Sequence, residues 1–566
     1  MGKRILFFLI ILNLIVLSNL FSFTISDYKI NGNNSLGIEF TNIDNSYYET
    51  VYSEGVAKGA NLLDEFFLQT KINEVSLTGL GSFIINKEDV AFRKIFIEAS
   101  KDKIILNAGD IYPQESELSL ANIRIRGLKF EYTDQFNDQS YKYKIVKPLY
   151  ESLETGKLID NSLPSYYYQK KNLTRLITGL SFKTFAGYSY VSSNVNKTKG
   201  TSLPPDQFLI GIKTDLSLIA NSNLNVSYIQ AEDKESVAGY NKQDGSIISM
   251  NFNKLFMNTL LNNDRIIFST ELAKSKYDEN TDDTEGEKDD RAYYGNLEYK
   301  YKDLSFKIKY YKYNSDFKNI GNPFIQVDKK GFLSEINYAI CNTYFFNLFY
   351  EDYKNNLNNS DDTTEQTTVW SPTLQLKFPD APEWILNYQK TKIDGENKNI
   401  TISDKDDFNL TTKFNLSFFN FLLGYKHTKY DDYETASDSN SYKCNGYNFS
   451  INYSLLNNRL YLFHYFYSDE FKYKSNSKIK NNFITFNSNY QLIPNKVIIN
   501  PLLEYRKSER DNNTLLDALS FQFNLDYILD YSKQIAFKFR YTDEDYSGTD
   551  LDNKIYSGRI EYKINF

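Results

Sequence analysis

The sequence predicts an all-β fold, namely a large antiparallel β-barrel that spans a membrane. First, apolar and polar side chains alternate with a period of two over many stretches, as they do in strands with two different faces. Second, short turns alternate with long polar loops from Arg175 onward, in units of about 40 residues. Third, the 566 residues include 47 Tyr and 42 Phe, although the mean hydropathy is −0.51. This combination favours a barrel whose apolar face is turned outward.

Residues 1–22 are predicted to be a signal peptide. Lys3 and Arg4 precede two apolar runs, 5–11 and 14–17, and small polar residues follow. An uncleaved anchor helix is the alternative, but the apolar stretch is shorter than the ~20 residues that a spanning helix needs. Since no later stretch is apolar enough for such a helix, strands are the remaining way to cross a membrane.

Residues 23–174 form a less regular N-terminal β region, which we interpret as the first barrel strands or a partial plug. The candidate strands are 36–43, 65–72, 75–85, 92–99, 103–108, 123–133, 141–147 and 165–170. Several are too short to span a bilayer alone. If all eight form strands the barrel has about 28 strands, and if only the better ones do it has about 24 to 26. A separate β-rich periplasmic or plug domain is the alternative.

Residues 175–566 are predicted to form the transmembrane β-barrel. Twenty strands are indicated directly here, the first at 175–192 and the last at 554–566. Most run about 10 to 15 residues, which is long enough to cross a bilayer when the strand is tilted. Phe537 and Phe539 illustrate an apolar face that is expected to contact lipid. The residues between and beside them belong to a polar face that is expected to line an aqueous lumen.

The C-terminal strand ends in an aromatic signature. Tyr562, Ile564 and Phe566 occupy alternate positions of this strand. In this strand the chain resembles the bacterial outer-membrane β-barrel (porin-like) class, in which the last strand typically ends in Phe. The resemblance implies that these three residues form the assembly signal that the barrel assembly machinery recognises. It also implies a place in the cell outer membrane, short periplasmic turns and long acidic extracellular loops.

The polar face predicts a porin-like channel or passive transporter for small polar solutes. The candidate lumen-lining residues are Glu504, Arg506, Asp526, Lys538, Arg540, Arg559, Glu561 and Lys563. We expect mixed charges on neighbouring strands to create a transverse field that orients a permeating solute. Cross-strand ion pairs that only stabilise a polar interior are an equally open interpretation. Because so wide a barrel would leak if left open, we expect inward-folded loops or residues 148–172 to occlude it.

The alternative function is surface display or adhesion, in which the extracellular loops bind a partner. The longest run of carboxylates in these loops lies at 278–290. Its spacing does not match a Ca²⁺-binding loop, so we interpret it as a solvated, self-repelling loop.

The composition argues against several other classes of function. With 2 His, 2 Cys and no GxSxG motif, we expect no enzyme, no catalytic residues, no cofactor and no metal site. The net charge of −7 disfavours nucleic-acid binding. Cys341 and Cys444 are predicted at opposite ends of the barrel, where they cannot form a disulfide. The expected partners are outer-membrane lipid, the assembly machinery and small polar solutes, and the sequence does not define the oligomeric state.

Overall fold

The computed structural model describes residues 30–43, 59–85, 90–113, 116–120, 124–136, 177–189, 207–219, 221–233, 242–257, 259–261, 263–284, 286–318, 325–358, 364–395, 401–434, 439–547 and 553–565. Its strands are β1(Ile30–Ile43), β2(Gly59–Ile72), β3(Val75–Ile85), β4(Val90–Lys101), β5(Ile104–Ile111), β6(Ile125–Gln135), β7(Ile177–Ser189), β8(Gln207–Leu218), β9(Ser222–Asp233), β10(Asp244–Met257), β11(Arg265–Asp278), β12(Lys288–Tyr301), β13(Leu304–Tyr313), β14(Lys329–Ile340), β15(Tyr344–Lys354), β16(Gln366–Leu376), β17(Glu383–Asp394), β18(Thr401–Leu416), β19(Phe419–Asp432), β20(Tyr442–Leu455), β21(Leu460–Tyr473), β22(Lys478–Ile493), β23(Val497–Arg510), β24(Asn513–Asp530), β25(Lys533–Tyr546) and β26(Asn553–Asn565). Among the described residues, no helix is long and apolar enough to cross a membrane.

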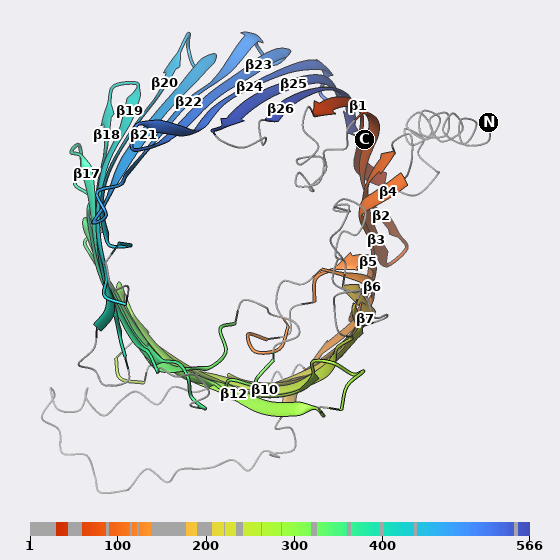
Figure 1. Ribbon diagram of the computed structural model, residues 1–566. Coiled ribbons are helices and arrows are strands. Elements are labelled where there is room, and N and C mark those ends of the chain that lie inside the picture. Colours follow the sequence, from red (N-terminus) through yellow and green to blue (C-terminus); the bar gives the residue numbers. More distant parts are fainter. Residues whose placement is uncertain are drawn as a thin grey trace, which may run out of the picture.

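The 26 strands form one antiparallel sheet that closes into a β-barrel (Figure 1). Each strand pairs with its neighbours in the chain, and the barrel closes where β1 pairs with β26. Asn33 lies opposite Asn565 at this seam, and the Ser35 hydroxyl donates a hydrogen bond to the Glu561 carboxylate. β1 therefore starts, and β26 ends, at the end of the barrel that carries the short turns. We call this the turn end and the opposite one the loop end.

The barrel architecture confirms the predicted all-β fold, and the strand count exceeds the twenty strands that the sequence indicated directly. Those twenty correspond to β7–β26, and the total of 26 falls within the expected range of 24 to 28. The additional strands β1–β6 overlap six of the N-terminal candidates. β1 and β2 each begin six residues earlier than expected, because cross-strand pairing extends them through stretches with weak alternation. Candidates 141–147 and 165–170, and the signal peptide at 1–22, lie outside the described residues.

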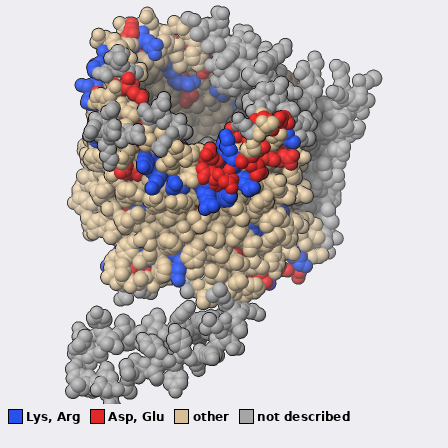
Figure 2. Space-filling model, turned by 60° about the horizontal axis from the view of Figure 1, so that its bottom comes forward, with Lys and Arg blue, Asp and Glu red and all other residues tan. Residues whose placement is uncertain are grey.

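The two faces of the sheet are as different as the alternation predicts. On β25, Phe537 and Phe539 point outward and are 45% and 42% exposed, whereas the inward-facing Ala536 and Thr542 are buried. Figure 2 shows the result on one side of the molecule as a broad belt of uncharged residues on the outer wall, with charged residues gathered at a rim. The largest apolar surface of the molecule is therefore its outer face.

The connections at the loop end are not uniformly long, which differs from the expected pattern. β23 and β24 are joined by Asp511 and Asn512 alone, and β21 and β22 by residues 474–477. Asp511 and Asn512 have φ values of 51° and 68°. Two successive residues in the left-handed region give a tight hairpin turn whose twist matches that of the strands. Short turns therefore occur at both ends of the barrel.

Candidate functional site

A segment of the chain folds from the wall into the lumen between β5 and β6. We call residues 112–124 the lumen segment, of which 112–113, 116–120 and 124 are described. Figure 1 shows it inside the barrel, on the side of β10 and β12. A bridge between Ser116 and Leu120 closes a tight turn at its centre. This finding agrees with the expectation of inward-folded loops, whereas residues 148–172 lie outside the described part of the chain.

Two leucines anchor the lumen segment to the inner wall. Leu118 and Leu120 are fully buried. Leu118 packs in a cluster with wall residues that include Ile247 of β10 and Ala273 of β11, and Leu120 packs in a second cluster that includes Leu209 of β8. These wall residues lie on the inner face, which is otherwise polar. Their apolar side chains are stable there because the segment shields them from water.

Hydrogen bonds to four strands reinforce the apolar contacts. The Leu118 amide N–H donates to Oε1 of the buried Glu271 of β11, at 3.3 Å. Lys309 Nζ of β13 lies 2.5 Å from Glu117 Oε1. The serine hydroxyls of the segment bond to the wall as well, since Ser119 accepts from Ser227 of β9 and Ser116 lies 3.3 Å from Ser249 of β10. The segment is therefore fixed along the wall from β9 to β13.

The base of the lumen segment is held by a carboxylate between two guanidinium groups. Asp110 precedes the segment, and its side chain lies 2.6 Å from Arg124 Nη2 and 2.9 Å from Arg126 Nε. It also accepts a hydrogen bond of 2.7 Å from the Ile95 amide N–H. Gly109 makes the bend before it, with φ of 100°, and a Cβ atom there would lie 2.2 Å from the Ile95 carbonyl oxygen. β5 thus separates from β4 at a position that only glycine fits, while it stays paired with β6 as far as Ile111.

The described start of the connection between β13 and β14, residues 314–318, covers the same stretch of wall. Phe317 is fully buried in the cluster that contains Leu118. The next residue, Lys318, donates its amide N–H to Ser275 Oγ of β11 at 3.1 Å. Two connections from different parts of the chain therefore fold onto the inner wall of β10–β13.

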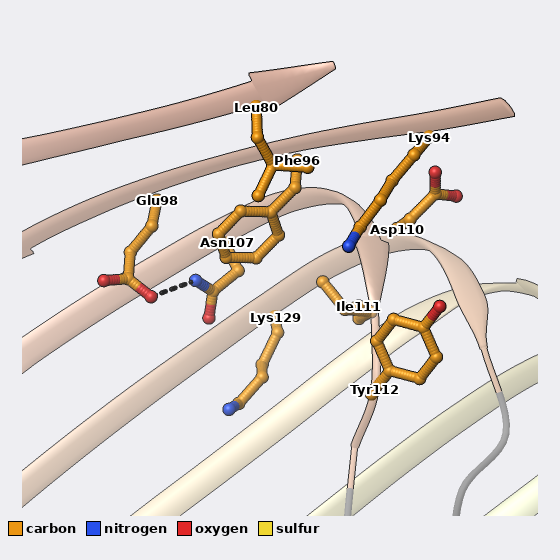
Figure 3. Close-up of a pocket in the computed structure, with 9 residues that line it drawn as sticks. All are labelled: Leu80, Lys94, Phe96, Glu98, Asn107, Asp110, Ile111, Tyr112 and Lys129. Carbon is orange, nitrogen blue, oxygen red and sulfur yellow. Dashed lines mark hydrogen bonds between the residues drawn. The ribbon is translucent and has the colours of Figure 1, made fainter. Parts of the chain in front are cut away.

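A pocket of mixed polar and apolar lining lies between the base of the lumen segment and the inner wall of β3–β6 (Figure 3). Asn107 Nδ2 donates to Glu98 Oε2 at 2.9 Å. Lys94, Lys129 and Tyr112 surround the same space. The pocket combines cationic, carboxylate and aromatic groups, and this mixture suits small polar solutes without specifying one.

The register places all eight predicted lumen residues on one face of β23–β26, which is the inner face. Several of them form ion pairs within the wall. Glu561 lies 2.9 Å from Lys538 and 3.3 Å from Arg559, and Arg506 lies 3.3 Å from Glu544. Glu544 was not among the predicted residues, although its alternation with Thr542 and Arg540 indicates the inner face.

The remaining predicted lumen residues make fewer charged contacts. Asp526 accepts a hydrogen bond from Gln534 at 2.7 Å, and Arg540 donates to Thr542 at 3.3 Å. Lys563 lies 3.7 Å from Glu561, and Glu504 lies opposite Ser520 on the same face. Of the predicted assembly signal, Tyr562 and Ile564 lie on the outer face of β26, and Phe566 lies outside the described residues.

No protein-family model and no curated protein matches this sequence. Among solved structures, the siderophore receptor PirA from Pseudomonas aeruginosa is similar, with 8% identity, a TM-score of 0.41 and coverage of 95% of this chain and 80% of the receptor. The translocation pore of the P pilus usher PapC has 7% identity and a TM-score of 0.35 over 95% of this chain and 99% of the pore. OccAB4 from Acinetobacter baumannii has 10% identity and a TM-score of 0.29 over 64% and 98%. The barrel architecture of this chain rests on its own strand pairing.

Proposed function

We propose that the protein is a porin-like channel of the outer membrane that passes small polar solutes passively. The observation that supports this best is the difference between two stretches of the inner wall. The lumen segment and the β13–β14 connection fold onto one stretch of wall, β9–β13, whereas the inner face of β23–β26 carries charged residues that pair within the wall. A lumen that is narrowed on one side and lined with charged residues on the other supports a selective polar pathway.

The outer face supports the proposed place in a membrane. Its exposed apolar residues extend around the barrel, including Leu128 of β6, Phe346 of β15 and Ile560 of β26. Such a belt is unfavourable in water and stable against lipid acyl chains. Lipid is therefore the expected partner of the outer face, and small polar solutes are the expected partners of the inner one.

Planar-bilayer recording tests the proposed channel. The purified protein should insert as discrete conductance steps, and vesicles containing it should swell in small polar solutes. Migration in electrophoresis before and after heating shows in parallel whether the barrel is closed. A heat-modifiable, folded protein that gives no conductance would contradict the channel and leave the barrel intact.

Surface display is the second candidate, and the structure of residues 278–290 bears on it. Lys276 Nζ lies 3.1 Å from Glu287, and Lys318 Nζ lies 3.2 Å from Glu279, so lysines of the rim partly neutralise these carboxylates. The loop is thus attached to the rim as a defined acidic surface. Deletion of residues 280–286 separates the two functions, since display requires loss of surface binding with solute uptake unchanged.

A further inference from the structure

We propose that the outer face of the barrel binds the phosphate groups of anionic lipid headgroups through two rows of lysines at the loop end. The first row crosses β13–β15 and contains Lys312, Lys330 and Lys354. The second row crosses β19–β22 and contains Lys429, Lys443, Lys472 and Lys478. In each row every lysine lies directly opposite the next one on the neighbouring strand. This proposal goes beyond solute passage, although it rests on the proposed place in a membrane.

Among the described residues, no lysine of the first row pairs with a carboxylate, although Asp352 lies two residues from Lys354 on the same face and accepts a hydrogen bond of 2.7 Å from Gln366. Like charges directly opposite each other on adjacent strands destabilise a sheet. Within the part of the chain that the structure describes, none of the three lysines of this row forms an ion pair. Strands β17 and β18, which follow β16 along the sheet, contrast with it, because Lys390 lies 3.0 Å from Asp404 and Lys392 lies 2.8 Å from Asp394. An external anion is the group that would balance the first row.

The second row is partly compensated. Lys429 pairs with Asp431 at 2.5 Å, and Lys472 pairs with Glu470 at 2.8 Å. Lys443 and Lys478 have no ion pair among the described residues and are exposed. The row keeps a net positive charge on the outer surface, so it has the same character as the first row on a different side of the barrel.

The height of the rows on the wall matches a headgroup layer. The outward-facing Ile340 marks the turn end of β14 and is 44% exposed. Lys330 lies ten residues away on the same face of that strand. Ten residues span about 33 Å along a strand, or about 25 Å along the membrane normal at a tilt of about 40°. The apolar belt of an outer-membrane barrel is about 25 Å tall, which places the lysines at its boundary with water.

Lipid is favoured over a soluble anion because the lysines adjoin the apolar belt. Phe332 lies two residues from Lys330 on the outer face, and Tyr447 lies four residues from Lys443 on that face; both are exposed. A ligand that contacts both kinds of residue needs a phosphate group joined to an apolar body. An anionic phospholipid has this form, and basic residues beside a membrane attract it.

The two tryptophans allow a direct measurement. Trp370 lies on the outer face of β16, 38% exposed and four residues from Gln366, which is opposite Lys354. Trp384 lies near the turn end of β17 and is 39% exposed. In vesicles, W384F leaves Trp370 as the reporter beside the first row, and W370F leaves Trp384 as the matched reporter far from it. Quenching by brominated phosphatidic acid is compared with quenching by brominated phosphatidylcholine.

We expect Trp370 to show a preference of about fivefold for phosphatidic acid, and Trp384 to show a much smaller one. The K312Q/K330Q/K354Q variant should lower the preference at Trp370 to that at Trp384. The K443Q/K478Q variant removes two lysine charges of the second row, far from Trp370, and should leave its preference unchanged. All these lysines are on the surface, and heat-modifiable migration confirms that each variant folds.

Three results would overturn the proposal. One is equal preference at the two tryptophans, and another is a preference at Trp370 that persists in the triple variant. Loss of the preference on addition of millimolar inorganic phosphate would point to a soluble anion instead of lipid. If neither lipid quenches either tryptophan, the proposed membrane placement fails as well, which separates that failure from the loss of headgroup preference alone.

Discussion

The inner walls of β9–β13 and β23–β26 belong to one regular sheet but interact with different groups. On β9–β13, small and apolar residues such as Ser227, Ile247 and Ala273 allow the lumen segment to pack directly on the wall. On β23–β26, long charged residues such as Lys538 and Glu561 pair with each other in the plane of the wall. The difference lies in the side chains and not in the backbone. It shows that one barrel can present a covered wall and one that no described segment covers, which we call the open wall.

Removal of the lumen segment, which abolishes the difference between the covered and the open wall, should have the largest effect on conductance. Replacement of residues 113–123 by a short Gly-Ser linker exposes the apolar wall and widens the lumen. Single-channel conductance should then rise about twofold or more, since current grows with the open cross-section. A matched deletion of residues 280–286, which belong to a rim loop, should leave conductance unchanged. Equal conductance of both deletion variants would show that the segment does not narrow the pathway.

The buried carboxylate of the covered wall provides the second test. Glu271→Ala removes the acceptor of the buried Leu118 amide, so the free energy of unfolding should fall by about 2 kcal/mol. Glu271→Gln keeps an acceptor oxygen and should cost clearly less. Urea unfolding in detergent measures both variants. If the two variants were equally stable, this hydrogen bond would not fix the segment.

Ion selectivity tests the open wall. Glu561 compensates Lys538 and Arg559, so Glu561→Gln leaves an excess of positive charge on the inner face. The reversal potential in a salt gradient should shift toward anion selectivity by several millivolts. Lys538→Gln in the same chain should restore the original value. An unchanged reversal potential would mean that this wall does not contact permeating ions.

Chemical labelling of the cysteines is expected to perturb the protein least, and it tests the orientation of the barrel in the membrane. Both thiols are free in the structure; Cys341 is exposed in a turn at the turn end, and Cys444 is buried near the loop end. A maleimide that cannot cross the membrane should label Cys341 only from the periplasmic side, because short turns are predicted to be periplasmic. Cys444 should remain unlabelled until unfolding. Labelling of Cys341 in intact cells would reverse the predicted orientation.

The strands, and the face of the sheet that each side chain occupies, were predictable because both depend on local alternation. Phe537, Lys538 and the other residues of β25 alternate in the sequence as they do in the barrel. The weak alternation of β1 and β2 explains why their starts were misplaced, since there the partner strand and not the side-chain pattern defines the element. The tight turn at Asp511 and Asn512 likewise depends on two backbone conformations that the pattern of long loops concealed.

The sequence by itself determined that the chain forms a barrel with a polar interior and an apolar exterior, because a period of two is a local property that each strand carries alone. Only the tertiary structure decided which wall is covered. The contacts of Glu117 with Lys309 and of Leu118 with Glu271 join residues more than 150 positions apart, and each side chain in isolation resembles its neighbours on the inner face. Closure of the sheet into a barrel brings these positions together, and no local sequence pattern predicts such long-range contacts.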